Sequence, residues 1–145
     1  MRKRILIIED DKNLVRLLKD AFEGRYDVNL ALDWAEGKSK LASGLPDLIV
    51  LDILLPGESG FDALRQLKAD AATRRIPVIV LSNLGQEQEI RTGLTLGAVD
   101  YLVKADITIE DVVRKVQRVL NSASSQRTPH RSQAARRGPK RSSRA

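Results

Sequence analysis

The chain has 145 residues, no cysteine and a formal net charge of +6, and this length suits a single domain of ordinary size. The lack of cysteine excludes disulfide frameworks, thiolate nucleophiles and sulfur-bound metals. The first apolar run, Ile5 to Ile8, meets acids at once, far short of the about 20 apolar residues of a membrane span. We therefore expect a cytoplasmic protein with no membrane partner.

Apolar runs of strand length alternate with segments of helical period, the pattern of five βα units in a parallel sheet. The runs at 5–8, 48–51 and 78–81 are apolar on both faces and are predicted to be central, whereas 27–30 and 99–103 have edge character. With right-handed crossovers this favours a doubly wound α/β sheet in the order 2-1-3-4-5. The expected helices span about residues 12–23, 34–43, 58–70, 86–96 and 108–121.

Positive charge is concentrated after the last predicted helix. Residues 1–121 hold 18 basic and 19 acidic side chains, while seven basic residues and no acid follow. We predict a near-neutral domain over 1–121 and a basic tail over 122–145. The tail has no aliphatic residue larger than alanine, so it cannot offset the entropy of ordering by burial and is predicted to be disordered.

Polar side chains stand where the predicted strands stop. Glu9 and Asp10 follow the first strand, Asp52 the third, Ser82 the fourth and Lys104 the fifth. In the predicted order the ends of strands 1 and 3 face one crevice. Carboxylates there suit Mg²⁺, Lys104 and Ser82 suit phosphoryl oxygens, and Asp52 becomes a candidate nucleophile that forms an acyl phosphate.

Each of these residues also has a purely structural interpretation. Asp11, and equally Asp10, could cap the following helix. Ser82 could cap the helix after it, Lys104 could be a solvated surface lysine, and Asp52 could begin a turn before Pro56. Their joint occurrence at matching strand ends favours the site over these separate explanations.

On these residues the chain resembles response regulator receiver domains over about residues 3–121. The resemblance implies that Asp52 accepts a phosphoryl group from the phosphohistidine of a sensor kinase or phosphotransfer protein. It further implies that Asp10, Asp52 and the Leu54 carbonyl hold Mg²⁺, with Glu9 reached through water. In the same comparison Lys104 is the family's lysine. The hydroxyl and aromatic switch positions match Ser82 and Tyr101.

Two features of the sequence depart from or stand out within the family pattern. Ala105 replaces the usual proline after the lysine, and a non-proline cis bond costs about 2.5–4 kcal/mol, so we predict a trans or visibly strained bond. Leu54 and Leu84 lie two residues beyond Asp52 and Ser82, where a polar side chain could orient the hydrolytic water. We therefore expect slow hydrolysis of the aspartyl phosphate.

We expect no second globular domain after residue 121, and the resemblance then points to a single-domain, chemotaxis-regulator-like signalling protein rather than a metabolic enzyme. It would act by docking on a downstream protein target or by passing the phosphoryl group on, as a monomer or a phosphorylation-dependent dimer. Candidates for the docking face are on the surface formed by helix 4, strand 5 and helix 5, with a solvated helical surface as the alternative: Arg91, Thr95, Tyr101, Arg114 and Arg118.

Other functions are less well supported. An aspartate-nucleophile phosphatase would require a carboxylate where this chain has Leu54, and a phosphorylation-independent interaction module remains the main alternative. The basic tail could bind nucleic acid or an acidic partner, but it has no aromatic residue for stacking on bases, and a solubilising extension is an equal alternative. His130 has no ligand partner nearby and is given no role.

Overall fold

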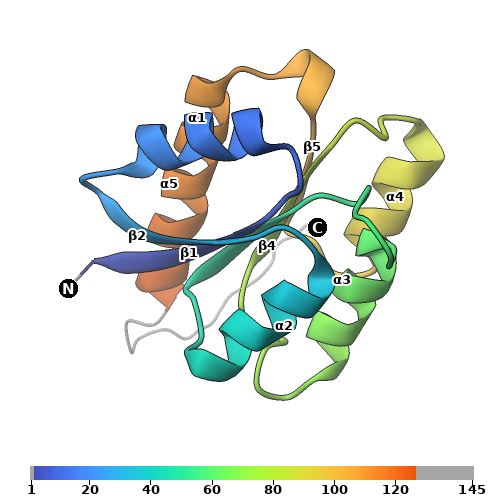
Figure 1. Ribbon diagram of the computed structural model, residues 1–145, viewed down its shortest axis with the longest axis horizontal. Coiled ribbons are helices and arrows are strands. Elements are labelled where there is room, and N and C mark those ends of the chain that lie inside the picture. The colour runs from blue at the N-terminus through green and yellow to red at the C-terminus, as the bar shows by residue number, and fades with distance from the viewer. Residues whose placement is uncertain (1, 127–145) are drawn as a thin grey trace, which may run out of the picture.

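Five parallel strands form one sheet at the centre of the molecule, as the computed structural model of the chain shows for residues 2–126 (Figure 1). The strands are β1 (Lys3–Ile8), β2 (Tyr26–Ala31), β3 (Leu48–Leu51), β4 (Val78–Ser82) and β5 (Asp100–Val103). Their order in the sheet is β2-β1-β3-β4-β5. The predicted topology is therefore confirmed, because the doubly apolar runs do take the central places.

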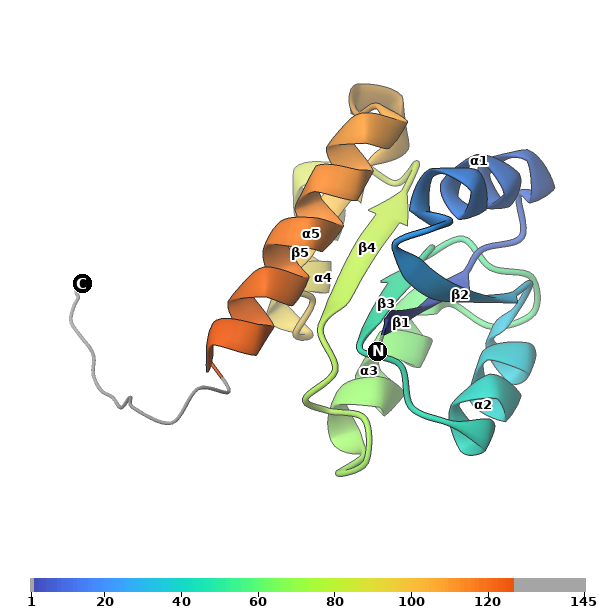
Figure 2. The same ribbon diagram turned by 90° about the vertical axis from the view of Figure 1, so that its left-hand side faces the viewer.

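The helices cover both faces of this sheet. They are α1 (Lys12–Phe22), α2 (Trp34–Ser43), α3 (Gly60–Ala69), α4 (Glu87–Thr95), the short 3₁₀ helix η1 (Lys104–Asp106) and α5 (Ile109–Gln126). Helices α1 and α5 lie on one face, and α2, α3 and α4 lie on the other (Figures 1 and 2). Among residues 2–126 no helix is long and apolar enough to cross a membrane.

Each face of the sheet has its own apolar core. On one face Leu18, Phe22 and Val116 pack against strand residues such as Ile7. On the other face Leu64 of α3 belongs to a second cluster built around β1, β3 and β4. Burial on both sides explains why the central strands have continuous apolar sequences rather than alternating ones.

Most helix starts are stabilised by side chains that accept backbone N–H groups. The Asp11 carboxylate accepts the amides of Asn13 and Leu14, so the predicted N-cap is confirmed. Asp33 caps α2 and Ser59 caps α3 in the same way. These caps set the direction in which the chain leaves each strand end, and hence the shape of the loops around the site.

Helix α5 continues to Gln126, beyond the end predicted at Asn121. The segment after Asn121 contains no glycine or proline before Pro129, and helices stop at such residues or at a loss of packing. The first residues of the predicted tail are thus helical. The rest of it, from residue 127 on and including His130, lies outside the described residues.

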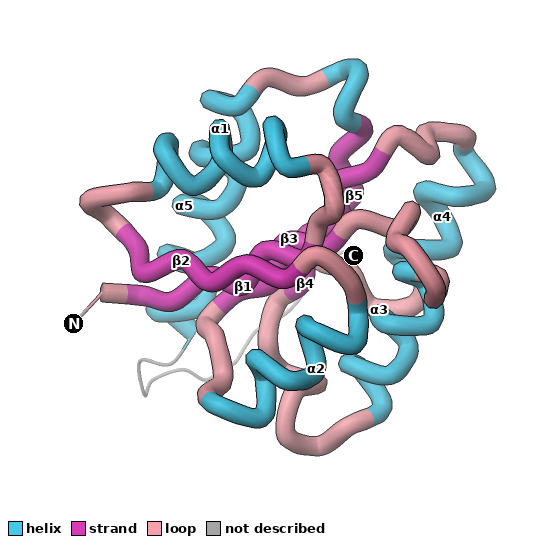
Figure 3. Tube along the Cα trace, viewed as in Figure 1, coloured by secondary structure: helices cyan, strands magenta, loops and turns pink. Residues whose placement is uncertain are grey.

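The strand register places the functional edge. Ile8 is opposite both Ala31 and Leu51, and Ser82 is opposite Val103. The residues that follow these positions therefore emerge together at the carboxyl edge of the sheet, where the loops after β1 and β3 lie close to each other (Figure 3). The described residues contain no cis peptide bond. The Lys104–Ala105 bond is therefore trans, as predicted, and Ala105 lies in η1.

Candidate functional site

Two buried carboxylates and one ammonium group form the centre of the site. The Lys104 Nζ lies 2.7 Å from Glu9 Oε1 and 2.9 Å from Asp52 Oδ2. Glu9 and Asp52 are only 2% and 3% exposed, and a buried carboxylate requires partners of this kind. The three residues come from three strand ends, and the structure brings them together as the sequence predicted.

Backbone hydrogen bonds hold the second oxygen of each carboxylate. The Asp11 amide donates to Glu9 Oε2 at 3.0 Å, and the Leu54 amide donates to Asp52 Oδ1 at 3.0 Å. The backbone amide of Asp52 in turn donates to the Ile8 carbonyl of β1. Each carboxylate is thus oriented by its own loop and by the neighbouring strand, which preorganises the site.

Gly60 allows the loop after β3 to fold back onto the site. A Cβ on Gly60 would lie 2.4 Å from both the Asp52 carbonyl oxygen and the Ile53 Cα, a distance that no side chain tolerates. The Gly60 amide also donates to the Ile53 carbonyl at 2.8 Å. The role of Gly60 was not predicted from the sequence, because a close approach of two backbone segments leaves no signal besides the glycine itself.

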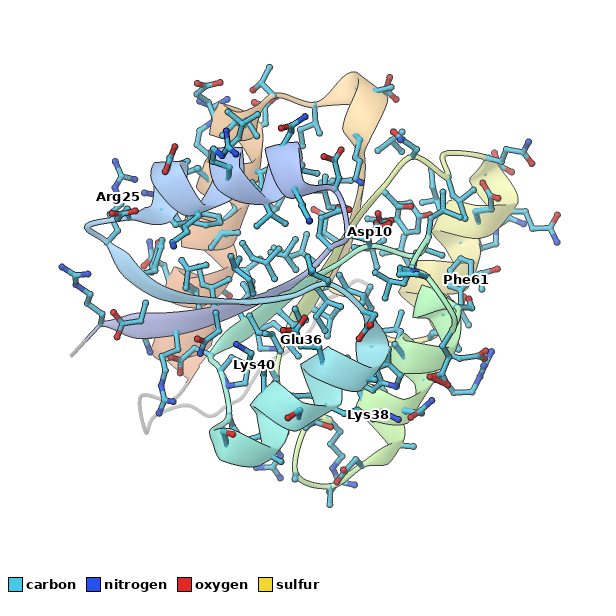
Figure 4. All side chains as sticks on the ribbon, viewed as in Figure 1. Asp10, Arg25, Glu36, Lys38, Lys40 and Phe61 are labelled. Atoms are coloured by element: carbon cyan, nitrogen blue, oxygen red, sulfur yellow. The ribbon has the colours of Figure 1, made fainter. Side chains whose placement is uncertain are left out.

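The acidic residues of this edge fit a magnesium ion. Glu9, Asp10 and Asp52 each offer a carboxylate oxygen, and these oxygens lie within 4.8 Å of one another. Asp10 is exposed and lies in the loop between β1 and α1 (Figure 4). Mg²⁺ prefers hard oxygen ligands and keeps several waters, and one exposed and two buried carboxylates match that requirement.

Burial and neighbouring charges shift the pKa values of Glu9 and Lys104. Burial raises the pKa of Glu9 to about 7, against the opposing effect of its hydrogen bonds with Lys104 and the Asp11 amide. Burial by itself would lower the pKa of Lys104, but the hydrogen bonds to Glu9 and Asp52 outweigh it and raise that pKa. Lys104 is therefore firmly cationic, while the carboxylates are not fully neutralised by it. A further cation would be favoured here.

Ser82 and Tyr101 are linked through one loop residue. Ser82 is fully buried, and its Oγ accepts the Leu84 amide at 3.4 Å. The Tyr101 hydroxyl donates to the Leu84 carbonyl at 2.6 Å. Burial raises the pKa of Tyr101, with the charges of Glu89 and Asp52 acting in the same direction. The tyrosine ring thus points inward and is connected to the site by the loop after β4.

The predicted docking residues do not form one uniform surface. Arg91 and Thr95 are exposed on α4, and Arg91 pairs with Glu87 at 2.6 Å. Arg114 is exposed on α5 and pairs with Asp111. Tyr101, however, is only 7% exposed, so in this conformation it offers almost no surface to a partner.

Comparison with known proteins identifies relatives of this arrangement. A family model described as "Response regulator receiver domain" matches residues 5–117. The response regulator PleD of Caulobacter vibrioides is 39% identical over 114 residues, which are 78% of this chain and 24% of PleD. The phosphate regulon transcriptional regulatory protein PhoB of Rhizobium meliloti is 38% identical over 115 residues, 79% of this chain and 51% of PhoB.

Solved structures of receiver domains are similar over nearly their whole length. The receiver domain of the Francisella response regulator 1452 gives a TM-score of 0.77 at 28% identity and covers 84% of this chain and 99% of that one. A CheY-like receiver domain protein of Methanospirillum hungatei gives 0.78 at 26% identity, with coverages of 87% and 99%. In contrast, the chain spans about a quarter of the length of PleD and about half of the length of PhoB.

Proposed function

This chain belongs to the response regulator receiver domain family of two-component systems, and we propose that Asp52 is its phosphoacceptor. The observation that carries the proposal is the contact of the Lys104 ammonium with both Asp52 and Glu9 at 2.9 and 2.7 Å. This contact leaves a nucleophilic carboxylate beside a fixed positive charge at the carboxyl edge of the sheet, where anionic ligands bind in such folds.

The reaction transfers a phosphoryl group from a phosphohistidine to Asp52. An oxygen of the Asp52 carboxylate attacks phosphorus, the P–N bond to the donor imidazole breaks, and the imidazole nitrogen keeps the electron pair and takes up a proton. The product is an acyl phosphate on Asp52. Lys104 Nζ lies 2.9 Å from an oxygen of the attacking carboxylate, so its charge can stabilise the phosphoryl oxygens as they arrive.

Mg²⁺, when bound, would reduce the repulsion between the acidic residues and the incoming phosphoryl group. The residues that would hold it are Asp10, Asp52 and the backbone carbonyl of Leu54, with Glu9 acting through water. The clustering of the three carboxylates within 4.8 Å supports this assignment. Substitution of Asp10 is expected to lower the affinity for Mg²⁺ without disturbing the core, because Asp10 alone of the three carboxylates is exposed.

The signal would pass from Asp52 to the surface formed by α4, β5 and α5. In this proposal the Ser82 hydroxyl moves toward the phosphoryl group, and the inward position of Tyr101 changes the docking face for a downstream protein. The donor would be a sensor histidine kinase or a phosphotransfer protein, and the phosphoryl group could also be passed onward in a phosphorelay. The role is that of a cytoplasmic signalling phosphoacceptor rather than a metabolic enzyme.

Incubation with acetyl phosphate and Mg²⁺, followed by intact-mass measurement, tests the proposal. The wild-type protein is expected to gain one phosphoryl group only when Mg²⁺ is present, and Asp52→Asn is expected to gain none. Asp20→Asn, a change at an exposed aspartate of α1, is the matched control and should behave as wild type. Failure with acetyl phosphate and with a purified phosphohistidine donor would favour a phosphorylation-independent interaction module.

A further inference from the structure

The two sides of the proposed Mg²⁺ site come from different loops. Glu9 and Asp10 follow β1, whereas Asp52 and Leu54 belong to the loop after β3. Mg²⁺ demands near-ideal octahedral geometry, so an ion can bridge the two sides only while the loops keep the right separation. The contacts that hold one loop relative to the other therefore affect the affinity for the ion.

A buried indole group is fixed on the β1 side of the site. Trp34 begins α2 and is only 3% exposed. A Cβ built on Gly37 would lie 3.3 Å from Trp34 Cε3, so the helix packs closely against the ring. The end of the preceding strand is tied to the site, because the Glu9 amide donates to the Ala31 carbonyl at 2.9 Å. The ring therefore has a defined place relative to Glu9.

The indole N–H needs an acceptor, because a buried donor without a partner is costly. Gln66 of α3 provides one, since its Oε1 accepts from Trp34 Nε1 at 3.1 Å. The Nε2 of the same amide donates to Glu58 Oε2 at 3.3 Å. An indole can only donate and a carboxylate can only accept, so both neighbours require the same orientation of the Gln66 amide.

Glu58 belongs to the same loop as Leu54. The hydrogen bond of the Gly60 amide closes the base of this loop, so residues 54–59 project beyond it. Within the described part of the chain, the bond from Gln66 to Glu58 is the one hydrogen bond that joins residues 54–59 to a residue outside the loop and the first turn of α3. Through Gln66 the projecting part of the loop is thus connected to the indole on the other side of the site.

We propose that Gln66 is a positioning residue for Mg²⁺, because it fixes the loop after β3 through Glu58 and anchors it to Trp34. The inference rests on the proposed function, since it takes the Leu54 carbonyl as a ligand of the ion. A loop whose ligands are already in place loses less conformational entropy when the ion binds. Loss of the Gln66 amide should therefore weaken the binding of Mg²⁺ by about two- to tenfold, the effect of one hydrogen bond.

An NMR titration of the ¹⁵N-labelled full chain with MgCl₂ tests the proposal. Gln66→Met removes both hydrogen bonds at a similar side-chain length, and its dissociation constant for Mg²⁺ is expected to rise by about two- to tenfold. Gln88→Met makes the same change at an exposed residue of α4 and should keep the wild-type constant. A purely structural role of Gln66 would lower the free energy of unfolding, measured in urea, and leave the dissociation constant of the folded protein unchanged.

Two substitutions of Glu58 separate the hydrogen bond from the charge. Glu58→Gln keeps an acceptor for the Gln66 amide, whereas Glu58→Met removes it, and both variants lose the same negative charge. Glu58→Met is therefore expected to bind Mg²⁺ more weakly than Glu58→Gln. The chain has one tryptophan, so its indole N–H gives a single assignable signal. That signal should shift in Gln66→Met and stay in place in Gln88→Met.

Several results would overturn the proposal. They are a wild-type dissociation constant in Gln66→Met, equal constants in the two Glu58 variants, or an equal loss of affinity in the Gln88→Met control. Each of these leaves the metal site and the phosphorylation of Asp52 in place. Absence of Mg²⁺ binding by the wild type would overturn the proposal too, but it would also remove the metal site and so count against the proposed function.

Discussion

Gly93 provides the space that the inward ring of Tyr101 occupies. A Cβ built on Gly93, a buried residue of α4, would lie 2.7 Å from Tyr101 Cδ2 and 3.0 Å from Cε2. Ordinary carbon contacts are about 3.5–4.0 Å. Gly93→Ala therefore cannot be accommodated unless the ring or the helix moves.

Two opposing effects determine the stability of this variant. Alanine is favoured over glycine in a helix interior by about 1 kcal/mol, and overpacking costs about 1–3 kcal/mol. We expect Gly93→Ala to lower the free energy of unfolding by up to about 2 kcal/mol. In the Tyr101→Ala background the clash is absent, and the same change should raise that free energy by up to about 1 kcal/mol.

Urea unfolding of wild type, both single variants and the double variant measures this change of sign. Contacting residues couple, whereas independent ones add within about 0.3–0.5 kcal/mol. If Gly93→Ala has the same effect with and without the tyrosine ring, then the helix does not depend on the ring position and the reasoning is refuted. Thr95→Ala, an exposed substitution on the same helix, is the matched control.

Three further predictions concern the site and its supports. Leu84→Glu should shorten the half-life of the aspartyl phosphate, because a carboxylate can orient water where leucine cannot; Leu84→Met is the control, and equal half-lives would contradict the idea. Mg²⁺ should raise the melting temperature, with about 2.7 kcal/mol of stabilisation at a hundredfold excess over Kd, and Asp10→Ala should abolish this rise; a rise retained in the variant would place the metal elsewhere. Asp11→Ala should lower the free energy of unfolding by about 1 kcal/mol through loss of the α1 cap, whereas Asp11→Asn should keep most of the stability of the wild type. Urea titration measures both free energies, and equal losses would mean that the cap contributes little.

Strand order and the composition of the site could be predicted because both depend on local patterns. Doubly apolar runs such as Leu48–Leu51 mark central strands, and parallel strands bring their ends to one edge. Hence Glu9, Asp52 and Lys104 could be grouped from their positions after strands. The pairing of one lysine with both carboxylates depends on side-chain geometry across three strands, which no periodicity encodes.

Other features depend on contacts between distant elements. Gly93 and Tyr101 meet only because α4 packs over β5 at a particular rotation, and sequence spacing contains no such angle. A cavity at the amino-terminal edge of the sheet is lined by Arg75, which precedes β4, and by Arg118 of α5, and these residues are far apart in the chain. The end of α5 was underestimated because polar residues after Asn121 were interpreted as a loss of helix.

In the proposed switch, Leu84 connects the Asp52 site to the region of Tyr101 and α4. Its amide donates to Ser82 Oγ at 3.4 Å, and its carbonyl accepts the Tyr101 hydroxyl at 2.6 Å. The first of these bonds is long and the second is short, so a ligand that attracts the serine hydroxyl would break the weaker bond first. Loss of that bond would free the loop after β4 while the Tyr101 contact persists. The serine can then move without expelling the ring, and the absence of a side chain on Gly93 leaves the ring its inward place. Phosphorylation would therefore stabilise a conformation that the chain already adopts, and the energetic effect would be a shift in population rather than a new fold.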